Sequence, residues 1–126
     1  MSLLLSIVEI GGYPDFSRLY QRKGFTVSRV DSMRKAVKVL KKDQPRVIVA
    51  EFNFQSDFRD RTSSLETLMA MVQRMPDTRV IVFYEQDQLP QLQRLLQVFP
   101  VFATLAFPID ESELEAALDE ILQEAA

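Results

Sequence analysis

Few side chains in this chain could carry out catalysis or bind a metal ion at a shared site. The sequence of 126 residues contains no cysteine and no histidine, which excludes thiolate nucleophiles, cysteine-ligated metals and the commonest general base at neutral pH. Functional groups would be expected directly after the apolar runs, and these positions hold Gly11 and Gly12, Glu51, Tyr84 and Phe107. Because only Glu51 among them is charged, the set lacks a conventional catalytic group and we expect no enzymatic activity.

The elements that position these residues are five apolar runs with helix signals between them. Strands are expected over Leu3–Ile10, Phe25–Val30, Arg46–Phe52, Arg79–Tyr84 and Phe102–Phe107. Continuous apolar runs are typical of strands covered on both faces, whereas the alternation in Phe25–Val30 favours an edge strand. The alternating β–α order predicts a parallel sheet, whose strand ends bring the candidates to one edge. We predict a three-layer, doubly wound α/β fold with strand order 2-1-3-4-5, in one domain over residues 1–126.

Capping residues and apolar stripes predict the helices between the strands. The first helix is expected to be short, about ten residues, and to end before Gly24. Asp31 or Ser32 is expected to cap the second helix. Ser63 and Asp110 each precede a glutamate by three residues, a spacing typical of the capping box at the start of a helix.

Charge is divided unevenly along the chain. Residues 1–63 contain 12 Lys and Arg against 7 Asp and Glu, a net +5, and residues 64–126 contain 3 against 11, a net −8. This division indicates either two differently charged solvated faces or electrostatic steering of a charged partner. The total of −3 is unlike the basic character of nucleic-acid-binding domains.

No run approaches the roughly 18 apolar residues of a membrane span, and Leu3–Leu5 lacks the flanks of a signal peptide, so we expect a cytoplasmic protein that binds neither nucleic acid nor membranes.

The order of the elements and two segments resemble the receiver domains of bacterial two-component response regulators. The third strand reads Pro-Arg-Val-Ile-Val-Ala-Glu and ends at Glu51, and the fifth is followed by Phe107-Pro108-Ile109-Asp110. Receivers have an aliphatic strand that ends in a phosphorylated aspartate, and a Lys-Pro segment after the fifth strand. The resemblance covers almost the whole chain. It implies the flavodoxin-like fold, a role in signal transduction and a cis bond between Phe107 and Pro108.

The departures from the receiver pattern affect each group that handles the phosphoryl group. Gly11 and Gly12 match the acidic pair that binds Mg²⁺, and Glu51 matches the phospho-acceptor with a side chain one methylene longer. Tyr84 matches the hydroxyl residue and Phe107 the lysine. Because phosphoryl transfer depends on positioning and charge stabilisation, these departures imply a pseudo-receiver. Such a domain is expected to bind no metal or cofactor, to remain unphosphorylated and to act through protein–protein contacts.

Several alternatives remain open for Glu51 and for the function. Three interpretations of Glu51 are possible. It is an exposed strand-end carboxylate without a role, or a fixed charge that mimics the activated state. In the third interpretation it forms a weak cation site together with Glu9 and Glu85. The alternative functions are a receiver that is still phosphorylated with unusual ligands, and a small-ligand-binding or enzymatic flavodoxin-like domain that uses the loop over residues 53–63.

The resemblance also implies a surface for a signalling or output protein or for a second copy of the chain. That surface spans the fourth helix, fifth strand and last helix, and includes Gln91, Arg94, Gln97 and Val101. The loop over residues 53–63 adds Phe54 and Phe58, four positions apart among polar residues. We expect both rings to fold back over the vacated site; if the loop projects instead, they form an apolar patch for a partner.

Overall fold

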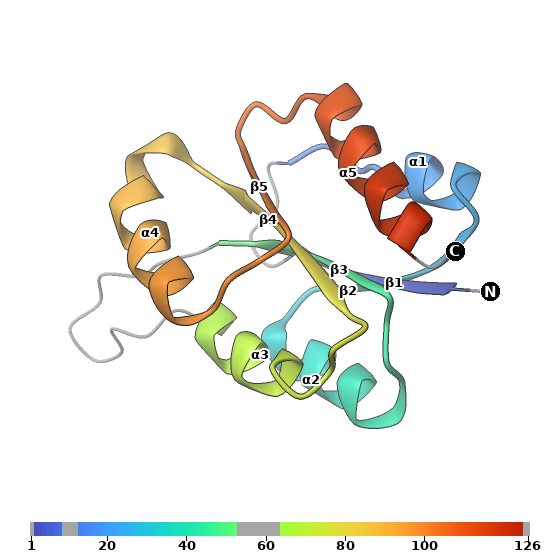
Figure 1. The fold of residues 1–126 in the computed structure, drawn as a ribbon, viewed down its shortest axis with the longest axis horizontal. Helices are drawn as coiled ribbons and strands as arrows, with labels where there is room; N and C mark the ends of the chain where they lie inside the picture. Colours follow the sequence, from blue (N-terminus) through green and yellow to red (C-terminus); the bar gives the residue numbers. More distant parts are fainter. Residues whose placement is uncertain (1, 9–12, 53–63, 125–126) are drawn as a thin grey trace.

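A computed structural model describes residues 2–8, 13–52 and 64–124. Five strands form one sheet in the order β2-β1-β3-β4-β5, and each neighbouring pair is parallel (Figure 1). The strands are β1 (Ser2–Ile7), β2 (Phe25–Val30), β3 (Val47–Glu51), β4 (Arg79–Tyr84) and β5 (Ala103–Ala106). The predicted fold class and strand order are therefore confirmed.

Helices cover both faces of the sheet. They are α1 (Ser17–Arg22), α2 (Met33–Lys42), α3 (Ser64–Val72), α4 (Leu89–Val98) and α5 (Glu111–Glu124), and a short 3₁₀ helix, η1 (Gln86–Gln88), precedes α4. α1 and α5 pack on one face, and α2, α3 and α4 on the other (Figure 1). No described helix is both long enough and apolar enough to cross a membrane.

The two faces of the sheet have separate apolar cores. Val49 and Ile81 belong to the core under α1 and α5, and their chain neighbours Ile48 and Val82 belong to the core under α2, α3 and α4. Side chains alternate between the faces of a strand, so the successive residues Val47–Ala50 of β3 and Val80–Phe83 of β4 must be apolar to fill both cores. This explains the continuous apolar runs, and β2 lies at the edge of the sheet as its alternation predicts.

Three strands are shorter than their apolar runs predict. β1 ends at Ile7 rather than Ile10, and residues 9–12 lie outside the described part of the chain. β3 and β5 do not include the terminal residues of their runs, which are Arg46, Phe52, Phe102 and Phe107. Phe52 is nevertheless only 1% exposed. The apolar runs are longer than the strands because residues beyond a strand end also pack against the core.

The helix ends differ in part from expectation. α1 has six residues rather than about ten, because the Asp15 carboxylate accepts hydrogen bonds from the Ser17 amide at 2.9 Å and the Ser17 hydroxyl at 2.6 Å in a turn before the helix. Ser32, not Asp31, caps α2. Gly24 follows α1 with a φ of 93°, which suits a residue that ends a helix, and the Phe107–Pro108 bond is cis as expected.

Two arginines hold the carboxyl end of α5 against the start of β3 and β4. The Arg46 guanidinium donates a hydrogen bond of 2.6 Å to the carbonyl of Ile121. This carbonyl belongs to the last turn, where carbonyl groups lack partners inside the helix. Arg79 pairs with Glu124 at 2.9 Å. The end of α5 opposite the candidate site is therefore fixed to the sheet.

Candidate functional site at the carboxyl edge of the sheet

Glu51 is the last residue of β3 and is buried. Its partner on β4 is Phe83, and paired residues on neighbouring parallel strands point to the same face of the sheet. That face is the one covered by α1 and α5, because Phe83 belongs to their core. Glu51 is 3% exposed, so the interpretation of this residue as an exposed strand-end carboxylate is wrong.

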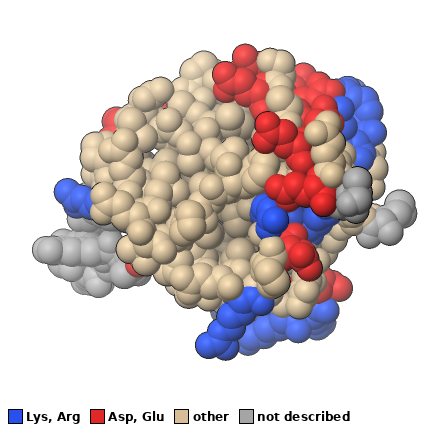
Figure 2. All heavy atoms as spheres, viewed as in Figure 1, with Lys and Arg blue, Asp and Glu red and all other residues tan. Residues whose placement is uncertain are grey.

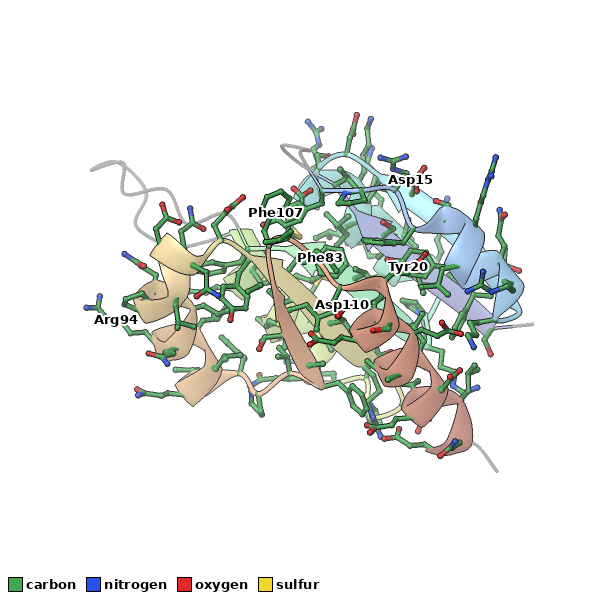
Figure 3. All side chains as sticks on the ribbon, turned by 90° about the horizontal axis from the view of Figure 1, so that it is seen from above. Asp15, Tyr20, Phe83, Arg94, Phe107 and Asp110 are labelled. Atoms are coloured by element: carbon green, nitrogen blue, oxygen red, sulfur yellow. The ribbon has the colours of Figure 1, made fainter. Side chains whose placement is uncertain are left out.

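Four aromatic rings surround this end of the sheet, and we call Tyr13, Phe16, Phe83 and Phe107 the aromatic cluster. The Tyr13 ring centroid lies 5.5 Å from that of Phe83 and 5.6 Å from that of Phe107. The Phe16 and Phe83 centroids are 6.0 Å apart, with the rings edge to face. These separations are favourable for aromatic pairs. The cluster joins the segment before α1 to the ends of β4 and β5, and Figure 3 shows Phe83 and Phe107 at the same edge.

A small cavity remains beside Glu51. It has a volume of about 20 Å³, and its lining includes Ser6, Tyr13, Glu51 and Phe83. A cavity of this size accommodates about one water molecule. This cavity is therefore too small for an organic cofactor or a substrate.

The electrostatic environment of Tyr13 is acidic. Burial, followed by the negative charges of Glu85, Glu51 and Asp87, raises the pKa of Tyr13 from 10.0 to about 12. Each of these effects disfavours the charged tyrosinate. At neutral pH the Tyr13 hydroxyl therefore keeps its proton and remains a hydrogen-bond donor among carboxylates.

We expect Tyr13 to ionise well above the ordinary tyrosine range, and a spectrophotometric tyrosinate titration of wild type against Tyr13→Phe checks this. The folded-state pKa is raised, so the stabilisation from protonated Tyr13 is fully present below pH 10.0 and is lost as the pH rises through about 12. Thermal unfolding of Tyr13→Phe should therefore depend less on pH across this window. A Tyr13 transition at pH 10.0 or below would contradict the arrangement of the cluster.

The other candidates lie in different surroundings. Tyr84 is on the face opposite Glu51 and packs against the core under α2, α3 and α4, so Phe83 rather than Tyr84 stands beside the carboxylate. Phe107 is 38% exposed and contacts the Tyr13 ring. The remaining candidates at this edge lie outside the described residues, namely Glu9, Gly11, Gly12, Phe54 and Phe58.

Tyr13 and Phe83 are the site residues that inspection of the sequence did not single out. Alternation along β4 does not by itself distinguish Phe83 from Tyr84, because the register in which Glu51 pairs with Phe83 decides which residue lies beside the carboxylate. No pattern in the sequence indicates that Tyr13, seventy residues earlier in the chain, contacts Phe83.

The expected partner surface is only partly exposed. Arg94 and Gln97 are exposed on α4, and Figure 3 shows Arg94 pointing away from the sheet. Gln91 is half-buried, with its side-chain oxygen inaccessible to solvent. Val101 packs against the core. Val98, which was not among the candidates, is 64% exposed next to Gln97.

The described residues contain no close group of ligands for the magnesium ion that the resemblance to receivers implies. Mg²⁺ is usually bound through carboxylates together with water. Within residues 2–8, 13–52 and 64–124, no three Asp, Glu, His or Cys residues are grouped closely enough to hold a metal ion. The aromatic rings of Phe83 and Tyr13 lie next to Glu51 instead. These residues therefore give no support to a reaction that needs bound magnesium.

No protein-family model and no curated protein matches the sequence, whereas solved receiver domains match the structure. A response regulator receiver domain protein from Clostridium thermocellum has a TM-score of 0.77 at 15% identity, with 99% of this chain and 97% of that chain covered. The signal receiver domain of an HD domain-containing protein from Pseudomonas fluorescens Pf-5 has a TM-score of 0.73 at 18% identity, covering 98% and 95%. NtrX from Brucella abortus has a TM-score of 0.76 at 13% identity, covering 98% of this chain but 28% of that chain. The chain therefore has the fold of a response regulator receiver domain.

Proposed function

We propose that this chain is a regulatory signalling domain that acts through protein–protein contacts and is not phosphorylated. The observation that carries the proposal is the aromatic cluster beside Glu51. The Phe83 ring lies next to the carboxylate, and Tyr13 lies 5.5 Å from Phe83. A phosphoryl group on Glu51 would need to displace these rings, because the cavity beside the carboxylate holds about one water.

The charges at this edge also disfavour a phosphoryl group. Phosphorylation adds about −1.5 to −2 charge, and Glu51, Glu85 and Asp87 are already close enough to raise the pKa of Tyr13. Arg29 lines the same cavity but pairs with Asp15 at 3.1 Å. The position that resembles the receiver lysine holds Phe107, whose ring contacts Tyr13. Among the described residues, the added negative charge would therefore meet more carboxylates than cations.

The surface over α4 and β5 supports the proposed action through protein–protein contacts. The large hydrophobic residues exposed among the described positions are Val98 at 64% and Phe107 at 38%. Figure 2 looks onto this face and shows a mainly uncharged surface over β5 and the adjoining side of α4, next to the acidic residues of α5. An uncharged area bordered by charge suits a protein partner. We assign the partner contact to this surface, with Arg94 and Gln97 at its edge.

We expect no acyl phosphate when the protein is incubated with acetyl phosphate and Mg²⁺, because the rings and carboxylates around Glu51 exclude the phosphoryl group. Intact-mass spectrometry measures the result directly. A receiver domain that has the aspartate, the acidic pair and the lysine serves as the positive control. Glu51→Asp should also stay unmodified, because shortening the side chain does not remove the neighbouring rings.

A stoichiometric, Mg²⁺-dependent gain of one phosphoryl group would overturn the proposal. In that case Glu51→Gln identifies the acceptor. A gain that disappears in Glu51→Gln would support the alternative of a phosphorylated receiver with unusual ligands, and a gain that persists would place the modification elsewhere in the chain.

A further inference from the structure

The outer side of β2 has no strand beside it. β2 lies at the edge of the sheet and pairs only with β1. The Val8 amide donates to the Val30 carbonyl at 2.9 Å, so Val30 faces β1, and the backbone groups of successive residues alternate in direction along a strand. Three residues of β2 therefore direct their N–H and C=O groups away from the sheet, namely Phe25, Val27 and Arg29. No hydrogen bond within the described residues uses these outward groups.

β2 lacks the features that keep the other edge of the sheet from pairing. β5 has only four residues, and Pro108 follows two positions after its end; short strands and prolines protect an edge. β2 has six residues and no proline, and its Phe, Thr and Val residues favour extended backbone. Its single charged side chain, Arg29, pairs with Asp15 at 3.1 Å. The outer edge of β2 is therefore suited to pairing with a further strand.

The neighbouring helix α1 is too short to cover β2 along its length. The helix has six residues and extends for about 9 Å at 1.5 Å per residue. β2 also has six residues but extends for about 20 Å at 3.3 Å per residue. Thr26 and Arg29 are exposed, and Val27 and Ser28 are half-buried, so the middle of the strand is accessible.

β2 is complementary to β2 of a second copy about Val27. In an antiparallel pair with a two-fold axis at this residue, Val27 lies opposite Val27 of the second copy, and Phe25 lies opposite Arg29 of the second copy. These are the three residues whose backbone groups point outward. Residues opposite each other in a hydrogen-bonded pair exchange both N–H···O bonds, so this register forms up to about six hydrogen bonds between the copies.

The charges around β2 suit this antiparallel register. Lys23 precedes the strand and Asp31 follows it, so Lys23 of each copy lies across from Asp31 of the other. Because both residues already pair within their own molecule, they favour the register but do not drive the contact. The two Arg29 side chains lie about 13 Å apart along the strands at 3.3 Å per residue, which is beyond the Debye length of about 8 Å at physiological salt.

We infer that the chain forms a two-fold dimer through antiparallel pairing of β2 with β2 of a second copy, which joins the two sheets into one. The same surface contributes from both copies, so the contact is isologous and closed. β5 lies at the opposite edge of the sheet, so the α4 and β5 surface stays accessible on each copy. The inference does not depend on the absence of phosphorylation. One strand from each copy makes a small contact compared with the roughly 1,200–2,000 Å² of a stable interface, so we expect a weak dimer.

Cysteine cross-linking tests the register, because the chain contains no cysteine of its own. In the dimer the Cα atoms of residue 27 on the two copies lie about 5.5 Å apart, within the range of a disulfide, whereas those of residue 26 lie about 8 Å apart, outside that range. Val27→Cys should therefore form a covalent dimer under mild oxidation at least about tenfold faster than Thr26→Cys. Thr26 is the more exposed residue, so random collision would favour the opposite order. Equal rates, or faster cross-linking of Thr26→Cys, would overturn the inference.

Val27→Pro provides a second test by analytical ultracentrifugation of the whole chain. Proline removes the outward N–H group of residue 27 but none of the bonds to β1, and an edge strand tolerates proline in this orientation. We expect the wild type to dimerise at up to about 1 mM protein and Val27→Pro to dimerise at least about tenfold more weakly. Val27→Thr keeps the N–H group and the branched side chain, so this matched control should dimerise like the wild type.

Circular dichroism verifies that the variants fold, and if Val27→Pro does not, the two cysteine variants decide the question. A wild type that remains monomeric at the highest concentration would overturn the inference. So would a dimer that Val27→Pro leaves unchanged, because self-association would then use another surface.

Discussion

Replacing Phe83 with alanine is expected to lower the free energy of unfolding by about 3–5 kcal/mol, the range for a large aromatic residue removed from a core. Phe83 is 4% exposed, and its ring contacts both Tyr13 and Phe16. Its loss leaves a cavity between the sheet and the segment before α1. Urea denaturation measures the change, because a lower midpoint at an unchanged slope reports a loss of stability.

Phe107→Ala is the matched control, since Phe107 contacts the same Tyr13 ring but is 38% exposed. We expect this variant to lose only about 1–2 kcal/mol, because less apolar area returns to water. The Tyr13 titration adds a local readout: Phe83→Ala should lower the pKa of Tyr13 from about 12 toward 10.0, because burial is its main cause. If both variants lost the same free energy of unfolding and the pKa of Tyr13 did not change, Phe83 would not be the residue that buries Tyr13 beside Glu51.

The sheet was predictable from the sequence because its constraints are local or general. Apolar runs identify β3 and β4 as strands covered on both faces, and right-handed crossovers restrict the order in which such strands can pair. A capping residue acts on the helix that directly follows it, so the start of α2 after Asp31 or Ser32 could also be predicted, and Ser32 forms the cap. The length of α1 was less predictable, because the turn at Asp15 and Ser17 competes with the first turn of the helix.

The site was harder to predict because it depends on register and on contacts between distant segments. β4 is apolar on both faces, so the sequence did not show whether Phe83 or Tyr84 stands beside Glu51; the pairing of β3 with β4 decides this. The burial of Glu51 likewise depends on the end of β4 and on Tyr13, which lies before α1. A carboxylate at a strand end is exposed by default, and only this long-range packing changes the outcome. The departures from the receiver pattern could be identified in the sequence, whereas the rings beside Glu51 could not.

Replacing Leu92 with alanine is expected to lower the free energy of unfolding by about 2–5 kcal/mol. Leu92 is fully buried and belongs to the core under α2, α3 and α4, together with Leu95 of the same helix. These residues fix α4 to the sheet and so position the surface that we assign to a partner. The same denaturation experiment measures the loss, and α4 should become less protected in amide hydrogen exchange than the central strands.

Val98→Ala tests the opposite side of the same helix. Val98 is 64% exposed, so its loss should change stability by no more than about 0.5 kcal/mol, and the higher helix propensity of alanine offsets part of any loss. Val98 would then contribute little to folding and remain available for the partner contact that we assign to this surface. If Val98→Ala were destabilised as much as Leu92→Ala, Val98 would be part of the core. The surface over α4 and β5 would then lose its main exposed hydrophobic residue, and with it the argument that a partner binds there.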